Sequence, residues 1–234
     1  MDRSVPQHQP IGALVEPHPA KRPQRPTLRG RHVTLVPLAG DHARSLFENS
    51  SGAANDSLWS YLFNGPFASL EAFAADVEAK AKADDPHYFA VIDNRTGKAV
   101  GYQSLMRIDA AHRVIEVGGI MYTPLLQGTA GSTEAQYLFA RHVFDDLGYR
   151  RYEWKCNDLN APSKRVARRL GFAFEGVFRQ HMIVKGRNRD TAWFSMLDSE
   201  WPARKAAFET WLAPENFDAA ERQRVSLAAL NGLV

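Results

Sequence analysis

The sequence predicts a mixed α/β domain of the α+β kind, with a mostly antiparallel central sheet and helices on both faces. Two segments, 88–106 and 172–197, alternate apolar and polar residues and are each interrupted by turn residues, which predicts two antiparallel hairpins. A third segment, 114–157, follows the order strand, helix, strand, which predicts a connection of the kind that joins parallel strands.

The composition is that of one folded domain with appendages. The chain has 234 residues, of which 44% are hydrophobic and 24% are charged, as is usual for globular proteins. The formal net charge is +3, without the dense basic clusters that nucleic-acid binding requires, so we expect a small anionic ligand and no nucleic-acid partner. The single cysteine, Cys156, excludes an internal disulfide and favours a reducing, cytoplasmic location.

The two ends of the chain differ from its middle. Residues 1–26 are rich in proline, which predicts an extended N-terminal arm. The folded body spans 27–200, and residues 201–234 predict a C-terminal helical extension with a helix near 202–212. No segment has the roughly 18 consecutive apolar residues of a membrane-spanning helix, so we expect no membrane partner.

The first half of the chain alternates strand and helix patterns. In order, we expect a strand at 31–38, a helix at 43–49, a helix after Ser69, and the hairpin strands 88–93 and 99–106. The aromatic segment 58–63 lies between the two helices and belongs either to the core or to the wall of a pocket. In the second interpretation, Trp59 and Tyr61 contact the substrate.

The second half carries the residues of chemical interest. In order, we expect a strand at 114–122, a helix at 133–148, a strand at 151–157, a helix from Asn160 to Gly171, and hairpin strands at 172–184 and 191–197. The first of these strands contains Gly118 and Gly119. A glycine pair is unfavourable inside a strand unless a bulge or a close ligand approach requires it.

A small-residue turn, 127–132, joins the strand at 114–122 to the helix that follows. Amides at a helix N-terminus lack intrahelical partners and carry partial positive charge, so such a turn can bind a pyrophosphate. The residues are Gln127, Gly128, Thr129, Ala130, Gly131 and Ser132. The alternative is an ordinary strand-to-helix turn.

This turn resembles the pyrophosphate loop of the GNAT superfamily of N-acetyltransferases. Thr133-Glu134-Ala135 is similar to a motif of its ribosomal-protein acetyltransferase-like branch, as are Asn160-Ala161-Pro162-Ser163, Leu170-Gly171-Phe172 and Glu175-Gly176. The resemblance covers roughly 27–201 and implies an acetyltransferase domain at 27–200. It also implies that the sheet splits between the strands beginning near Val114 and Arg151, and that acetyl-CoA, the co-substrate, enters this split.

The resemblance further implies the binding residues for acetyl-CoA. The pyrophosphate would lie on 127–133, which adds Thr133 to the loop, and a backbone N–H near Met121 or Tyr122 would bind the thioester carbonyl. Asn160 and Ser163 would contact the pantetheine or the sulfur. The acetyl group would pass directly to a primary amine of a small molecule or of a protein N-terminus. No histidine pair has metal-ligand spacing, so we expect no metal.

Two residues are candidates for proton transfer. Ser163 is a candidate acid for the departing sulfur, because Ala167 stands where many members of the superfamily carry a tyrosine; the alternative is a plain residue of the first helical turn. Glu116 is a candidate base, because burial in an apolar strand would raise its pKa. The alternative is a solvated charge or an ion-pair partner of Arg113 or Arg107.

Other candidates remain open. Arg179 and His181 are predicted to contact the acceptor, near the basic turn of the last hairpin, which also holds Arg187 and Arg189. Basic residues at 164–169 form either a solvated face or a site for the nucleotide 3′-phosphate, and Cys156 fits the core better than an acyl-enzyme. Ala130, Ser132 and Ala167 depart from the family pattern and leave open a binding domain without turnover. A homodimer is also left open.

Overall fold

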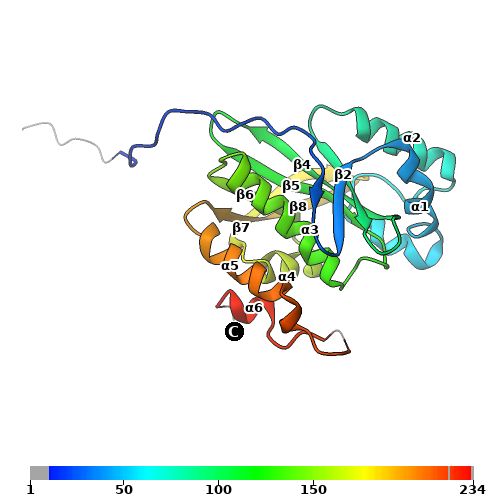
Figure 1. Ribbon diagram of the computed structural model, residues 1–234. Coiled ribbons are helices and arrows are strands. Elements are labelled where there is room, and N and C mark those ends of the chain that lie inside the picture. The colour runs from blue at the N-terminus through cyan, green and yellow to red at the C-terminus, as the bar shows by residue number, and fades with distance from the viewer. Residues whose placement is uncertain (1–10, 221, 233–234) are drawn as a thin grey trace, which may run out of the picture.

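The computed structural model describes residues 11–220 and 222–232, and one eight-stranded sheet forms its centre (Figure 1). The strands are β1 (Leu28–Arg29), β2 (Val33–Pro37), β3 (His87–Asp93), β4 (Ala99–Asp109), β5 (Val114–Tyr122), β6 (Arg151–Asn157), β7 (Ala173–Val184) and β8 (Arg187–Leu197). Their order in the sheet is β1-β2-β3-β4-β5-β6-β8-β7, and every neighbouring pair is antiparallel except β5 and β6. The predicted mixed, mostly antiparallel sheet is therefore confirmed.

Helices cover both faces of this sheet. The α-helices are α1 (Ala43–Glu48), α2 (Leu70–Lys82), α3 (Ala130–Arg141), α4 (Ala161–Arg169), α5 (Trp201–Leu212) and α6 (Leu227–Leu230). Shorter turns of helix are η1 (Gly40–His42), η2 (Ala53–Trp59), η3 (His142–Asp146) and η4 (Pro214–Asn216).

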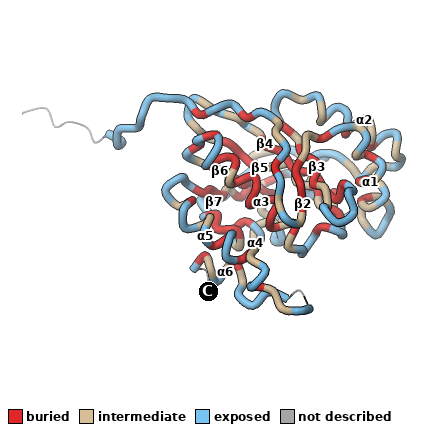
Figure 2. Tube along the Cα trace, in the orientation of Figure 1, coloured by how far each residue is buried: buried red, intermediate tan, exposed pale blue. Residues whose placement is uncertain are grey.

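Two hydrophobic clusters lie on opposite faces of the sheet. Ala90 of β3 packs with Phe73 of α2, whereas its neighbour Phe89 packs with Phe139 of α3 at a ring distance of 5.2 Å. Successive strand residues point to opposite faces, so α1 and α2 cover one face and α3 covers the other. Figure 2 shows the buried residues concentrated in the central strands and α3.

The sheet splits in its middle, as the resemblance implied. β5 and β6 pair only from Val114–Arg151 to Val117–Trp154, although β5 continues to Tyr122 and β6 to Asn157. The pairing of β4 with β5 also shifts register beyond Gly118, and Gly119 has a φ of +56°. A Cβ on Gly119 would lie 2.7 Å from the Tyr88 hydroxyl, so the glycine pair permits a bulge where the two strands separate.

Several element boundaries differ from the predicted ones; β4, for example, continues to Asp109 rather than ending at 106. α3 begins at Ala130, because the Thr129 side chain accepts a hydrogen bond from the Ser132 amide and caps the helix three residues earlier than expected. β8 begins at Arg187 rather than Thr191, because Lys185 and Gly186, with φ near +50° and +70°, make a two-residue turn. The segment 187–190 is therefore strand and not loop.

The terminal segments pack against the body in part. Residues 11–26 form no helix or strand, and the first ten residues of the predicted arm lie outside the described residues. Ala20 is buried and its amide donates to the Ala110 carbonyl at 2.9 Å. At the other end, Trp201 and Phe208 of α5 pack on Tyr137 of α3. Among the described residues, no helix is long and apolar enough to cross a bilayer.

Candidate active site

A cleft of about 1730 Å³ opens where β5 and β6 separate. It runs from the turn before α3, past the split, to the segment around η2 and the β7–β8 hairpin. Most of the predicted site residues line it: Tyr61, Glu116, Met121, Tyr122, Gln127, Gly128, Thr129, Ala130, Gly131, Ser132, Thr133, Asn160, Ser163 and His181. The fold thus brings together residues from four elements and three loops that are far apart in the sequence.

The turn before α3 has the form of an anion-binding loop. Gly128 has a φ of +73°, which a side chain would strain, and a Cβ on Gly131 would lie 2.9 Å from Val33. The Thr129 side chain uses the amide of Ser132, while α3 extends over twelve residues behind the loop. The remaining amides of the first turn lack intrahelical acceptors, so a phosphate group fits this end of the cleft.

Glu134 fixes the position of this loop. Its carboxylate accepts the backbone N–H groups of Arg31 at 2.7 Å, His32 at 2.6 Å and Val33 at 2.8 Å. These bonds tie the first turn of α3 to the start of β2. The glutamate of the Thr133-Glu134-Ala135 motif is therefore structural, and it holds the loop without contacting the cleft.

Only one of the basic residues at 164–169 lies against the loop. Arg169 donates to the Thr133 hydroxyl at 3.0 Å, and its guanidinium lies 4.8 Å from the centre of the Trp211 ring. Arg168 instead lies over the rings of Phe174 and Phe194. The charge that faces the phosphate end of the cleft is that of Arg169.

The backbone at the end of β5 faces the split. The Thr123 amide donates to the Val100 carbonyl at 3.1 Å, on the β4 side. Successive amides of a strand point to opposite edges, so the N–H of Tyr122 points toward the edge that β6 has left. Of the two predicted donors, Tyr122 has the suitable direction, whereas the Met121 side chain is buried in the cluster of α1 and α2.

Asn160 and Ser163 lie at the start of α4. The Asn160 side chain accepts the Ser163 amide at 3.1 Å, which confirms Asn160 as the N-cap. The Ser163 hydroxyl accepts the indole N–H of Trp154 at 3.0 Å, which leaves its own proton to be donated to another acceptor. Burial raises the pKa of the Cys156 thiol, partly offset by a hydrogen bond with Ser163, so Cys156 is a buried, protonated thiol. Ala167 is fully buried beneath them.

Glu116 lies within a group of buried charges. Its Oε2 is 3.0 Å from Lys155 Nζ and 3.1 Å from Arg107 Nε, and the Lys155 ammonium is also 2.7 Å from Glu153. Burial raises the pKa of Glu116, while the charges of Lys155 and Arg107 oppose that shift. The predicted alternative of an ion pair with Arg107 is therefore present, and Lys155 is a partner that the sequence did not reveal.

The other end of the cleft joins two separate segments. Lys185 in the β7–β8 turn donates to the carbonyl oxygens of Trp59 at 2.8 Å and Asn64 at 3.1 Å. The Tyr61 hydroxyl donates to the Leu159 carbonyl at 3.2 Å. These bonds close a pocket between the segment around η2 and the last hairpin.

His181 lies in this pocket. Its Nδ1 is 3.0 Å from the Thr191 hydroxyl. Burial lowers the pKa of His181, and the nearby cations Arg107, Arg189 and Lys155 lower it further. The imidazole is therefore neutral at pH 7 and able to accept a proton.

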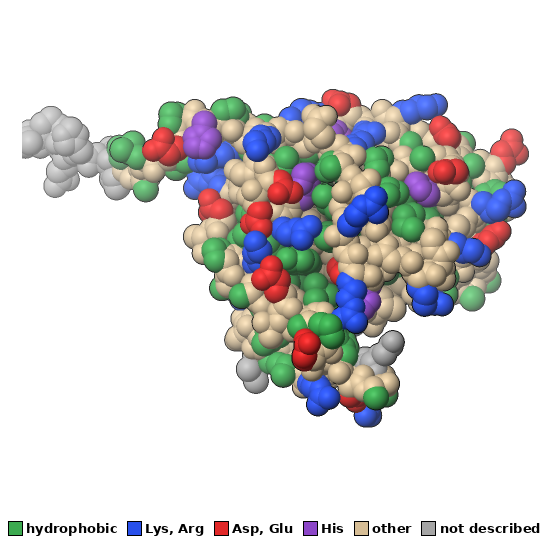
Figure 3. Space-filling model, viewed as in Figure 1, with side chains coloured by type: hydrophobic (Ala, Val, Ile, Leu, Met, Phe, Trp, Pro, Cys, Tyr) green, Lys and Arg blue, Asp and Glu red, His purple; other side chains and the backbone are tan. Residues whose placement is uncertain are grey.

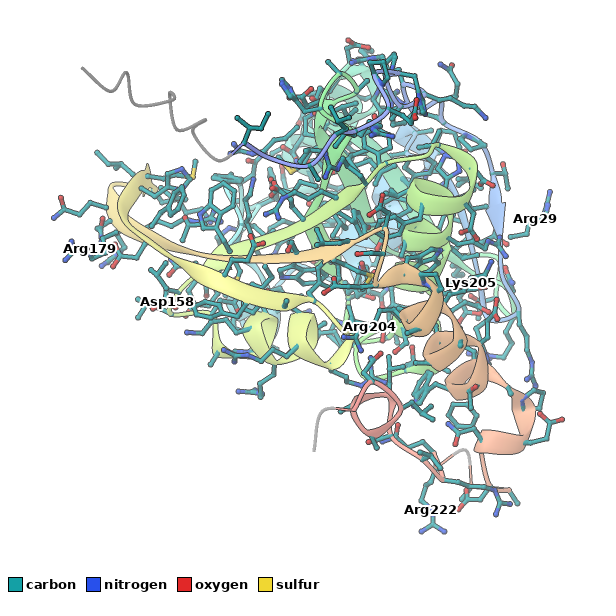
Figure 4. All side chains as sticks on the ribbon, turned by 90° about the vertical axis from the view of Figure 1, so that its left-hand side faces the viewer. Arg29, Asp158, Arg179, Arg204, Lys205 and Arg222 are labelled. Carbon is teal, nitrogen blue, oxygen red and sulfur yellow. The ribbon has the colours of Figure 1, made fainter. Side chains whose placement is uncertain are left out.

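Two predicted substrate-binding residues lie outside the cleft. Trp59 is 2% exposed, its indole donates to the Ser50 carbonyl at 2.9 Å, and its ring packs edge-on against Phe73. It belongs to the core, because α1 and α2 enclose it. Arg179 lies in a bulge of β7 and is exposed at the edge of the molecule, away from the cleft (Figure 4).

The sequence did not predict that the C-terminal extension forms part of the cleft wall. Trp211, Phe217, Arg222 and Gln223 line the cleft. The Trp211 indole donates to Gln223 at 2.7 Å, and Phe217 packs edge-on against Trp211. These residues belong to no recognisable motif. Only the aromatic residues Trp211 and Phe217, in an otherwise polar segment, could have indicated a binding surface.

On the side of the molecule that Figure 3 shows, Lys and Arg are interspersed with Asp and Glu, and no large patch of a single sign is present. Among residues 11–220 and 222–232, no group of three or more His, Cys, Asp or Glu is arranged to hold a metal ion. Most of the candidate catalytic and binding residues line the cleft.

Comparisons with known proteins identify the family. A family model described as an acetyltransferase (GNAT) domain matches residues 32–173. The crystal structure of a GCN5-related N-acetyltransferase from Brucella melitensis is similar with a TM-score of 0.90 and 52% identity, covering 92% of this chain and 98% of that one.

Two more distant relatives extend the comparison. The uncharacterized N-acetyltransferase YnaD of Bacillus subtilis is 26% identical over 149 residues, 63% of this chain and 85% of that protein. The microcin C7 self-immunity acetyltransferase MccE, solved in complex with acetyl-CoA and AMP, has a TM-score of 0.63 and 20% identity, covering 72% of this chain and 93% of that one. At that identity the likeness is one of fold.

Proposed function

Because the chain belongs to the GNAT acetyltransferase family and is an acyl-CoA-dependent N-acyltransferase, we propose that it transfers an acetyl group from acetyl-CoA directly to a primary amine. The amine belongs to a small molecule or to a protein N-terminus. One observation carries this proposal: a single cleft joins an anion-binding loop, a split in the sheet and a pocket with two candidate bases.

The cleft has the groups that acetyl-CoA requires. Amides of 127–133 and the Arg169 guanidinium suit the pyrophosphate, and Asn160 and Ser163 adjoin the path of the pantetheine. Trp211 and Phe217 of the C-terminal extension offer apolar surface beyond the loop, where the adenosine would lie. The complex of MccE with acetyl-CoA supports this use of the fold.

The reaction needs three contributions from the protein. The amine must lose a proton, the thioester carbonyl must be polarised, and the sulfur must gain a proton when the C–S bond breaks and the C–N bond forms. The backbone N–H of Tyr122 is suited to the carbonyl oxygen. The Ser163 hydroxyl, whose oxygen already accepts from Trp154, is suited to donate to the sulfur.

Glu116 is the proposed base, and its raised pKa supports that role. A second candidate is favoured by a specific observation: His181 is half-buried in the same pocket, has a lowered pKa and has no carboxylate among the ion-pair partners found in the described part of the chain. The two residues lie on the same side of the cleft, so their roles can be separated only by substitution.

The test combines binding with turnover. Acetyl-CoA should raise the Tm of the purified protein, and thiol release over a panel of primary amines should exceed release without amine. Mass spectrometry should find the acetyl group on the amine and none on Cys156. Stabilisation by acetyl-CoA without turnover of any amine would favour a binding domain instead, and no stabilisation would contradict both.

The proposal includes a cytoplasmic location. It is supported by the single cysteine, which is buried and forms no disulfide. Cell fractionation with an antibody against the protein tests it, and recovery outside the cytoplasmic fraction would overturn it.

A further inference from the structure

Arg189 is a buried cation without an ion-pair partner among the described residues. Its side chain lines the cleft and the residue is 8% exposed, and its Nε is buried without a hydrogen-bond acceptor. Over residues 11–220 and 222–232, no carboxylate lies within ion-pair distance of it. Charged groups are rarely buried alone, because burial removes their hydration without replacing it.

The neighbouring groups compensate this charge only in part. The ring of Phe63 lies 5.2 Å from the guanidinium and covers one of its faces. Glu116 is near enough to act on Arg189 electrostatically, but it already contacts Lys155 and Arg107. Glu153 contacts Lys155 and Arg151. This side of the cleft therefore holds more basic than acidic groups.

Arg189 belongs to the acceptor side of the cleft. The last pair between β6 and β8 joins Asn157 to Thr191, so Arg189, two residues before Thr191, lies beyond the end of β6. Alternation along β8 puts Arg189 on the face of Thr191 and Trp193, the latter beside Lys155. This is the face of Glu116 and His181, opposite to the face on which Ser163 and the phosphate loop lie.

We propose that Arg189 binds an anionic group of the acceptor, and that the acceptor is therefore an amine that also carries a carboxylate. A guanidinium presents a planar pair of N–H donors that matches a carboxylate, and the Phe63 ring restricts the plane of that pair. This inference rests on the proposed function, since it names the substrate class of the same site.

The test compares amines that differ only in charge. Amino acids and short peptides are paired with their carboxamides, and O-phosphoethanolamine is paired with ethanolamine to distinguish a carboxylate from a phosphate. Thiol release from acetyl-CoA should give kcat/KM at least tenfold higher for the acid of each carboxylate pair. In Arg189→Gln this preference should fall below twofold. Arg187→Gln is the control, since Arg187 is an exposed residue of the same strand and should keep the preference.

A second measurement does not depend on turnover. Glutarate, added with CoA, should raise the Tm of the wild-type protein and of Arg187→Gln but not that of Arg189→Gln. Without an anion, Arg189→Gln should melt no lower than wild type, because it removes an uncompensated charge. If Arg189→Gln does not fold, Arg189→Lys, which keeps the charge without the planar donor pair, takes its place.

The outcomes separate this inference from the proposed function. Equal kcat/KM for acids and carboxamides, or a preference that survives in Arg189→Gln, would overturn the carboxylate proposal and leave the acetyltransferase proposal intact. A preference confined to the phosphate pair would likewise overturn it in favour of a phosphorylated amine. If no amine is acetylated, the proposed function fails, and the glutarate shift alone decides whether Arg189 binds a carboxylate.

Discussion

Lys155 Nζ lies 3.0 Å from Glu116 Oε2, where the paired part of β5 and β6 ends and the split in the sheet begins. Both side chains are almost completely buried, at 6% and 7% exposed. A buried carboxylate that is held by an ammonium is a weaker base than its burial alone would make it. Glu116 therefore becomes a stronger base only when the bound acceptor weakens its contact with Lys155.

The first prediction separates the two candidate bases by substitution, with the pH profile of kcat/KM as the measurement. A base is inactive when protonated, so kcat/KM should fall as the pH drops through the pKa of that base. Burial raises the pKa of Glu116 above its ordinary value, whereas burial and nearby cations lower the pKa of His181 below its ordinary value. We expect Glu116→Gln to lower kcat/KM by about 100-fold and to abolish the acidic limb of the profile. If His181→Gln does so instead, the base is His181.

The second prediction concerns the phosphate loop. Gly128→Ala forces a side chain into a left-handed conformation, at a cost of about 1–2 kcal/mol, and should raise the KM for acetyl-CoA roughly tenfold by distorting the loop. Gly148→Ala is the matched control: Gly148 has a φ of +75°, and a Cβ there would also meet open space. It should lower Tm similarly and leave KM unchanged. Equal KM values for both variants would show that the loop does not bind acetyl-CoA.

The third prediction concerns the proton for the departing sulfur. Ser163→Ala should lower kcat by about 100-fold while the Kd of CoA changes little, because the hydroxyl acts when the C–S bond breaks. Ser163→Thr keeps the hydroxyl at the start of α4 and should retain most of the activity. Single-turnover measurements are required so that product release does not hide the effect. An unchanged kcat in Ser163→Ala would leave Ser163 as an ordinary residue of the first helical turn.

The fourth prediction follows from the position of Trp59. Trp59→Phe leaves the Ser50 carbonyl without its donor and creates a small cavity between α1 and α2, so unfolding free energy should fall by about 2 kcal/mol. Denaturant unfolding measures it, and the KM for acetyl-CoA should not change. Tyr61→Phe, at the partly exposed neighbouring aromatic, should be nearly neutral for stability. A change in acceptor KM without loss of stability would return Trp59 to the acceptor pocket.

The sequence predicted what depends on local pattern. Asn160 caps α4 through a bond to a residue three positions away, and alternation located β6 at 151–157 without error. The Gly118-Gly119 pair correctly indicated the bulge at the split. Each of these features is decided by neighbouring residues.

What the sequence missed depends on contacts between distant segments. Lys155 meets Glu116 because two strands with a helix between them pair in one particular register. Arg189 belongs to the basic hairpin where the sequence located acceptor selectivity, but its place in β8 and its burial in the cleft depend on how the strands pack. Trp59 follows the pattern of a pocket wall, but the packing of α1 and α2 decides its burial. None of these outcomes is encoded in spacing alone.

The bonds from Lys185 to Trp59 and Asn64 have a consequence for engineering. The proposed acceptor pocket is formed by two segments that are more than a hundred residues apart in the sequence and are joined by these hydrogen bonds. Replacing the hairpin alone would leave two carbonyl groups without a donor and the η2 segment without its support. A chimeric protein that is designed to take the acceptor selectivity of a relative should therefore exchange both segments together.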